Sequence, residues 1–183
     1  MKQLGWLASA SVLFVMVVAI EGWPALRDLN SNREWRSIDA TPDGASMNEL
    51  EVVVEEQIAA IAAQKPERTA MLIRLKMQVT PVAREAWKDC SVSLRNAAGQ
   101  VWLPLTSAST DGAVKALAPD HKNFGLCRLY PRSETADAET IRADQLFLLP
   151  SNKLEGLRLH VSGMGTRPHA LSFALNPKIR RLP

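Results

Sequence analysis

Hydrophobic positions along the chain fall into one uninterrupted run at the start and several alternating stretches farther on. The uninterrupted run extends from Leu4 to Ile20 and contains no charged residue. A membrane-spanning helix needs about 20 apolar residues, with about 17 as the lower limit, so this run just reaches the required length. The pattern predicts a transmembrane or signal helix over residues 1–23, which contacts the membrane through residues 4–20.

This apolar run has two interpretations, an uncleaved anchor and a cleaved signal peptide. A signal peptide ends at a cleavage site of small residues. Val17-Val18-Ala19 is a tolerable site, but a clear A-x-A motif is missing. Trp6 and Trp23 lie near the two ends of the run, where aromatic rings prefer the headgroup region of a membrane. We favour the uncleaved signal-anchor helix.

From Met71 onward the pattern changes to period two, which is typical of half-buried strands. Apolar residues occupy every second position from Met71 to Val79, and Pro81 ends this stretch. Similar alternation recurs over residues 90–94, 101–105, 141–149, 157–161 and 171–175, with turn residues between the stretches. Short alternating strands separated by turns predict an all-β fold, an antiparallel β-sandwich.

The phase of these strands divides the side chains into a predicted core and a predicted surface. The residues expected to be buried together are Ile73, Leu75, Leu94, Val101, Leu103, Phe147, Leu159, Val161 and Phe173. The residues expected to be exposed are Arg74, Lys76, Arg95 and Arg158. A slip of one residue in a strand would exchange its two faces, so burial of these side chains tests the register.

Composition divides the rest of the chain. Residues 24–47 are polar and contain Pro, Asn, Ser and Gly, which predicts a tether. The sandwich is expected over residues 48–177 and a basic tail over residues 178–183. Residues 48–64 stay ambiguous, because their glutamates and alanines favour a helix whereas Val52-Val53-Val54 favours a strand.

Cys90 and Cys127 are the only cysteines of the chain. In an exported domain such a pair is most simply a disulfide, whose Cα atoms lie about 4.4–6.8 Å apart. It would add about 3–4 kcal/mol of stability and restrain the long stretch 106–140, which is expected to be mostly loop. The alternative, two buried thiols in a cytosolic domain, fits poorly with the apolar N-terminal run.

The sequence offers no motif for catalysis, metal binding or nucleic-acid recognition. His121, His160 and His169 show no H-x-H or H-x₃-H spacing, and C-x₂-C, P-loop, G-x-S-x-G and G-x-G-x-x-G motifs are missing. A net charge of +3 and a hydrophobic content of 46% fit a globular, mildly basic domain. We therefore expect no enzyme activity, cofactor or metal, and neither nucleic acid nor a small molecule as ligand.

Two parts of the sequence carry a resemblance: Trp87–Trp102, and Phe147–Pro150 followed by Leu157–Val161. Together they resemble the bacterial membrane- or lipid-anchored immunoglobulin-like domains of unknown function. The resemblance covers about residues 71–175 and implies an immunoglobulin-like β-sandwich outside the cytoplasm, with a non-enzymatic role and no catalytic residue. The insert around residues 107–120 and the missing lipid-attachment cysteine depart from that group, so its anchoring and partner surface do not carry over.

Taken together, these observations predict a membrane-anchored extracytoplasmic interaction or accessory module of the cell envelope. It would be a single-pass protein of the cell membrane, with its C-terminal domain in the periplasm or outside the cell. The alternative is a secreted or periplasmic binding protein released by signal cleavage. A protein partner in the envelope is expected to meet a basic surface formed by Arg74 and Lys76, with Trp102 nearby if the lead-in segment leaves it uncovered.

Overall fold

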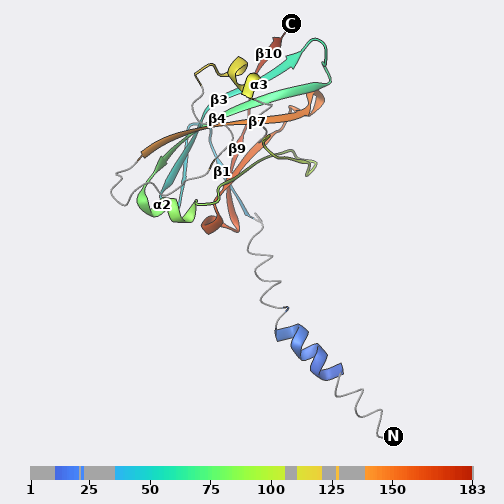
Figure 1. Cartoon of the computed structure of the whole chain (residues 1–183), viewed down its shortest axis with the longest axis vertical. Helices are drawn as coiled ribbons and strands as arrows, with labels where there is room; N and C mark the ends of the chain where they lie inside the picture. Colours follow the sequence, from blue (N-terminus) through green and yellow to red (C-terminus); the bar gives the residue numbers. More distant parts are fainter. Residues whose placement is uncertain are drawn as a thin grey trace.

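Two β-sheets pack face to face across an apolar core (Figure 1). The structure, a computed structural model, describes residues 11–20, 22, 36–105, 111–120, 127 and 139–182. The fold is therefore an all-β sandwich, as the period-two pattern of the sequence predicts.

The first sheet has five strands in the spatial order β1-β9-β8-β5-β6. Their bounds are β1 (Arg36–Ala40), β5 (Ser91–Arg95), β6 (Val101–Trp102), β8 (Arg158–Ser162) and β9 (His169–Ala174). β1 runs parallel to β9, and the other neighbours are antiparallel. Residues that lie opposite one another share a face. Leu94 and Leu159 therefore point into the sandwich, and Ser93 and His160 point away from it.

The second sheet has the order β10-β3-β4-β7, and β2 pairs with the first residues of β3. The bounds are β2 (Ala45–Met47), β3 (Leu50–Ala62), β4 (Arg68–Val79), β7 (Glu139–Pro150) and β10 (Lys178–Leu182). The central pairs β3–β4 and β4–β7 are antiparallel, whereas β10 is parallel to β3. β2 and β10 therefore lie on the same edge of β3, at its two ends.

Side chains from both sheets meet in one buried cluster, and most of the predicted core lies in it. The predicted residues found there are Ile73, Leu75, Leu94, Phe147, Leu159, Val161 and Phe173. Val101 and Leu103 are exposed, so the prediction for this hairpin is wrong. Trp102 lies opposite Leu94 and takes the inward phase instead, because the turn shifts the register by one residue relative to the expected one.

Within residues 48–64 the structure has a strand, β3 (Leu50–Ala62), and its pattern is irregular because it contains a bulge. The register with β4 shifts between Val54 and Glu56, which leaves Glu55 as an extra residue. Before the bulge, even-numbered residues such as Val52 point into the core. After the bulge, even-numbered residues such as Ile58 point to the outer face of the sheet.

The outer apolar residues of the second sheet are covered by α3 (Asp111–Leu117). Val114 and Leu117 of this helix pack with Ile58, Leu72 and Leu146 in a second buried cluster. The expectation that residues 106–140 are mostly loop therefore misses one helix. This helix also explains why the part of β4 around Leu72 is buried on both faces of the sheet.

The predicted boundaries of the sandwich are too narrow at both ends. Residues 36–40 and 45–47, expected in the tether, are strands β1 and β2. Residues 178–182, expected in a basic tail, form β10. β1 and β10 are edge strands that pair in parallel with segments distant in sequence, so they leave no local pattern in the chain, whereas β2 forms a tight antiparallel hairpin with β3.

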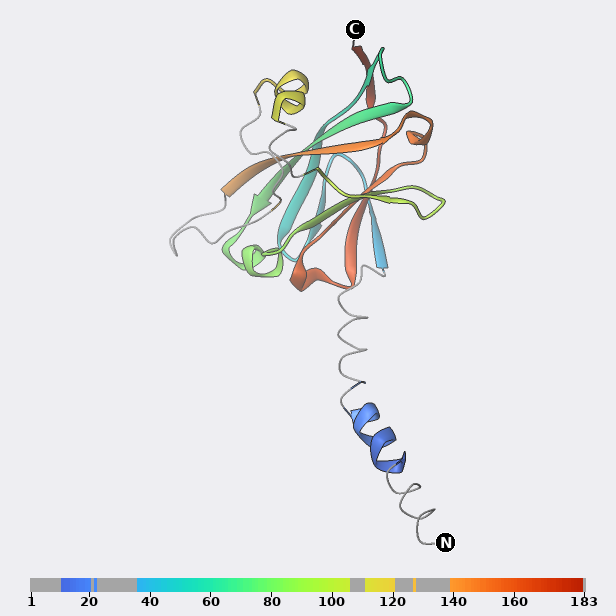
Figure 2. The same ribbon diagram turned by 45° about the vertical axis from the view of Figure 1, so that its right-hand side comes forward.

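The apolar N-terminal run is helical over its described residues 11–20. This helix lies apart from both sheets in the two views of the molecule (Figures 1 and 2). Its large apolar side chains, from Val12 to Ile20, are 52% to 71% exposed. None of the helices in the described part of the chain is long and apolar enough to cross a membrane.

A short helix and a 3₁₀ turn close one end of the sandwich. Helix α2 (Pro81–Ala86) follows β4; Pro81 suits its first turn, and the Thr80 hydroxyl accepts a hydrogen bond from the Ala83 N–H at 3.1 Å. The 3₁₀ helix η3 (Met164–Thr166) joins β8 to β9. Gly163 lies so close to α2 that a Cβ atom there would be 2.4 Å from the Ala86 carbonyl oxygen.

Gly163→Ala should therefore destabilise the protein by about 1–3 kcal/mol, because the added methyl group collides with backbone atoms that have little room to move. The measurement is the free energy of unfolding in urea. Gly112→Ala is the matched control, because a Cβ at this α3 position meets no atom within 4 Å. It should be neutral or stabilising by up to about 1 kcal/mol. Equal effects of the two substitutions would contradict the close packing of η3 on α2.

Candidate functional site

The disulfide predicted from the sequence is present. Cys90, just before β5, is bonded to Cys127, and their Cα atoms are 5.3 Å apart. Cys127 is buried in the main core, where its sulfur lies 3.7 Å from the Met77 sulfur. Since both cysteines of the chain are bonded, neither offers a thiolate as nucleophile or metal ligand.

Arg74 lies at the centre of an ionic cluster on the outer face of the second sheet. Its Nε donates to Asp144 Oδ1 at 2.7 Å, and its Nη2 donates to Asp144 Oδ2 at 3.0 Å. The same guanidinium donates two further hydrogen bonds to Asp120, both at 3.0 Å. Glu56 lies 3.6 Å away on β3. Three carboxylates therefore surround one cation.

The Arg74 charge is compensated by carboxylates within the cluster, and Arg74 is not the exposed residue that the alternation predicts. Its side chain is only 11% exposed and that of Asp144 only 3%. Hydrogen bonds to Asp144 and Asp120 raise the pKa of Arg74 above its ordinary value, although burial opposes this. The hydrogen bond from Arg74 lowers the pKa of Asp120. Because Asp120 follows α3 in the chain, this pair also ties the α3 segment to the sheet.

Lys76 and Arg142 share one carboxylate beside this cluster. Arg142 Nε donates to Glu55 Oε2 at 2.8 Å, and Lys76 Nζ lies 4.0 Å from Glu55 Oε1. The hydrogen bond to Glu55 raises the pKa of Arg142. Lys76 is half-buried, so it reaches solvent only in part. The bulge residue Glu55 thus places one negative charge between the two cations.

The structure does not bring Trp102 together with Arg74 and Lys76. Trp102 lies on β6 in the first sheet and packs against the main core from within. Arg74 and Lys76 lie on the outward face of the second sheet, in register with Asp144 and Arg142. The three residues expected to form a partner surface are therefore on opposite sides of the core.

A row of polar residues crosses the outer face of the first sheet. Ser172 lies opposite both His160 and Asp39, and its Oγ is 3.3 Å from His160 Nε2. Arg158 Nε donates to the same Oγ at 2.7 Å, and Arg158 also pairs with Asp39. Ser172 is fully buried. A buried hydroxyl that accepts a hydrogen bond from a guanidinium has neither the access nor the polarisation of a serine nucleophile.

The histidines do not form a metal centre within the part of the chain that the structure describes. His160 lies in this polar row, His169 is the first residue of β9, and His121 lies outside the described residues. Among the described residues, no group of three His, Cys, Asp or Glu side chains could hold a metal ion.

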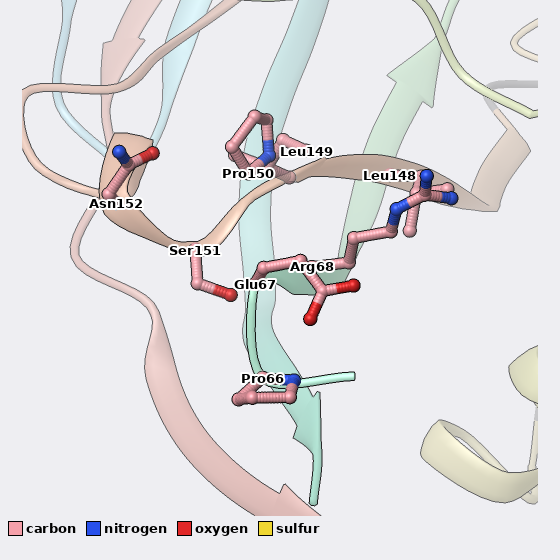
Figure 3. A pocket seen from close by; sticks show the side chains of 8 residues that line it. All are labelled: Pro66, Glu67, Arg68, Leu148, Leu149, Pro150, Ser151 and Asn152. Carbon is pink, nitrogen blue, oxygen red and sulfur yellow. The ribbon is translucent and has the colours of Figure 1, made fainter. Parts of the chain in front are cut away.

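An open pocket of about 640 Å³ lies where the turn between β3 and β4 meets the end of β7 (Figure 3). Its lining comprises Pro66, Glu67, Arg68, Leu148, Leu149, Pro150, Ser151 and Asn152. Pro66 and Pro150 lie on opposite sides of it, with Glu67 and Ser151 between them, and Arg68 extends towards Leu148 (Figure 3).

Backbone and hydroxyl contacts hold the two walls of this pocket together. Ser151 N donates to Glu67 O at 3.0 Å, and the Thr69 hydroxyl donates to the Ser151 hydroxyl at 2.8 Å. Leu148 is an exposed apolar side chain on the outward face of β7. The lining of the pocket therefore combines apolar residues with Arg68 and Glu67 and contains no cysteine or histidine. This composition suits contact with a protruding side chain better than it suits chemistry.

Sequence reasoning missed this pocket, although one signal was available. Leu148 falls on the outward phase of its strand, beside inward Phe147 and Leu149, and it precedes Pro150. An outward leucine at the end of a strand indicates a surface that another group can cover. The second wall comes from residues 66–68, which are distant in sequence, so the concave shape follows only from the pairing of β4 with β7.

Comparison with known proteins adds little to this picture. No protein-family model matches the chain, and no curated protein matches it. A solved structure of a conserved hypothetical protein from Bacillus anthracis is similar over 67% of this chain and 87% of that chain, with 10% sequence identity and a TM-score of 0.42. A likeness of this size carries no argument about function.

Arg74→Met should destabilise the protein by about 3–5 kcal/mol, because it leaves the buried Asp144 carboxylate without its charge partner. Lys76→Met is the matched control on the same strand and should cost at most about 1 kcal/mol, since a partly exposed pair at 4.0 Å contributes little. Urea unfolding of both variants measures the difference. Similar stabilities would mean that Arg74 is solvated in the folded protein, as the sequence alone suggested.

Proposed function

We propose that this protein is a membrane-anchored accessory or interaction module of the cell envelope, which acts by contact and not by catalysis. Its sandwich lies outside the cytoplasm, in the periplasm or at the cell surface. The observation that carries the proposal is the uncharged run from Leu4 to Ile20 together with the exposure of its described part. A helix whose large apolar side chains pack against neither sheet is stabilised by a lipid environment.

The disulfide supports an extracytoplasmic location. Such bonds form and persist in oxidising compartments and are rare in the cytosol. The Cys90–Cys127 bond joins the residue before β5 to Cys127 in the connection between β6 and β7.

The strand order supports an immunoglobulin-like arrangement of the sandwich. In that fold one sheet contains strands A, B and E, and the other contains strands C, F and G. Here β3, β4 and β7 are neighbours in one sheet, while β5, β8 and β9 are neighbours in the other. The disulfide departs from the usual bond between strands B and F, since neither β4 nor β8 carries a cysteine.

The contact surface that we propose is the open pocket beside Leu148. The basic surface expected from the sequence is less suitable, because Arg74 is occupied by its own carboxylates. The pocket lies at the end of β4 that begins with Arg68, and α2 follows the other end. The sandwich begins at Arg36, which lies beside Pro168 and η3, at the same end of the molecule as α2. The pocket is at the other end and therefore faces away from the anchor.

Fractionation of cells that express the full chain tests the anchor. We expect the protein in the membrane fraction after alkaline extraction, and we expect protease added from the extracytoplasmic side to degrade it. Intact mass separates this proposal from the alternative, a secreted or periplasmic binding protein, because signal cleavage would remove about 19–22 residues. A full-length protein in the soluble fraction would contradict both.

A photo-reactive amino acid at Leu148 tests the contact surface. In native membranes it should form an adduct with an envelope protein, because the exposed side chain lines the pocket. The matched control is the same amino acid at Ala174, an exposed position on β9 of the opposite sheet. Adducts of equal yield at both positions, or at neither, would reject the pocket as the contact surface.

A further inference from the structure

The end of the sandwich where the chain enters carries two exposed apolar side chains on adjacent elements. Val82, in the first turn of α2, is 65% exposed, and Met164, in η3, is 57% exposed. A Cβ atom at Gly165 would lie 2.8 Å from Ala86 Cα, so η3 packs directly on the end of α2. Both views show α2 at this end of the sandwich (Figures 1 and 2).

Direct contacts join the elements from which the two side chains extend. Asn48 Nδ2 donates to the Gly165 carbonyl at 3.4 Å, and the Trp87 indole N–H donates to the Met47 carbonyl at 3.1 Å. Trp87 itself is fully buried. The β2–β3 turn, α2 and η3 are therefore joined by direct contacts, and Val82 and Met164 project from this joined surface.

The point where the N-terminal segment joins the sandwich indicates what this surface faces. Arg36, the first residue of β1, donates its backbone N–H to Pro168 O at 3.0 Å, only two residues beyond η3. The apolar N-terminal run thus connects to the sandwich beside Met164. The segment between Ile20 and Arg36 could reach about 50 Å when fully extended, so tethering alone does not force contact. Burial of the exposed Val82 and Met164 side chains in lipid would favour contact between the sandwich and the membrane.

We propose that Val82 and Met164 insert into the lipid surface of the membrane that holds the anchor, so that the sandwich rests on the bilayer at its α2–η3 end. This inference rests on the proposed function, because it requires the anchor. Apolar side chains that project from a folded domain next to a bilayer enter the boundary between headgroups and acyl chains.

The contact is apolar and not electrostatic. The exposed charged side chains described at this end are balanced, with Arg36 and Lys88 against Glu49 and Asp89, whereas Arg84 is buried and Arg167 is partly buried. A balanced set gives no net attraction to anionic lipid. Insertion should therefore be the same with zwitterionic and with anionic headgroups, which separates it from binding by a basic patch.

Fluorescent labelling of the full chain in phosphatidylcholine vesicles tests the proposal. Val82→Cys and Met164→Cys are labelled with an environment-sensitive dye without reductant, so that the Cys90–Cys127 bond stays closed. The matched control is Ile179→Cys, which is 62% exposed on β10 at the opposite end of the sandwich. We expect blue-shifted emission at positions 82 and 164, quenching by spin-labelled lipid, and water-like emission at position 179.

The outcomes separate the two proposals. Flotation with the vesicles reports the anchor, and a chain that does not float rejects the anchor and the lipid contact together. A floating chain with water-like emission at positions 82 and 164 rejects only the lipid contact. A blue shift that spin-labelled lipid does not quench also rejects it, because a protein surface then covers these residues. Emission that is unchanged when phosphatidylglycerol is added supports the apolar contact, and emission that shifts only with phosphatidylglycerol overturns it.

Discussion

One extra residue in β3 determines what each face of the second sheet can do. The bulge at Glu55 exchanges the two faces of the strand, so that Val52 and Val54 enter the core on one side of it and Ile58 leaves the core on the other. The outer face of the sheet has a charged half and an apolar half, and the bulge brings β3 into line with this division of β4 and β7. α3 covers the apolar half. In the charged half, the carboxylates of Glu55 and Glu56 pair with the basic side chains of β4 and β7.

The charged half of the outer face stabilises the fold, so it is poorly suited to bind an acidic partner. A guanidinium surrounded by carboxylates gains nothing from a further acidic partner unless it loses one that it already has. Asp120 reaches Arg74 from the segment after α3, and Cys127 holds the same segment through the disulfide. An ionic contact at Asp120 and a covalent bond at Cys127 thus attach the connection between β6 and β7 to the sandwich at two described points.

The alternation of apolar and polar residues predicts some strands of this structure and fails to predict others. β4 alternates cleanly and has one inward face, so its residues and the core around Leu75 follow from period two. β3 does not alternate cleanly because of the bulge, and its sequence alone left helix and strand equally possible. The disulfide followed from having only two cysteines. The partners of Arg74 did not follow, because Asp120 lies in a connection whose path depends on tertiary contacts.

The proposed lipid contact at α2 and η3 and the proposed protein contact at the pocket lie at opposite ends of β4. This arrangement fixes how far the pocket can lie from the membrane. β4 begins with Arg68 at the pocket and ends with Val79 before α2, and its 12 residues are all paired with β7. At about 3.4 Å per residue the strand is about 37 Å long. If the α2–η3 end rests on lipid, the pocket stands at about this height above the bilayer, less the tilt of the strand. An envelope protein that meets it would have to present its contact at that level, and a partner confined to the membrane surface would not reach it.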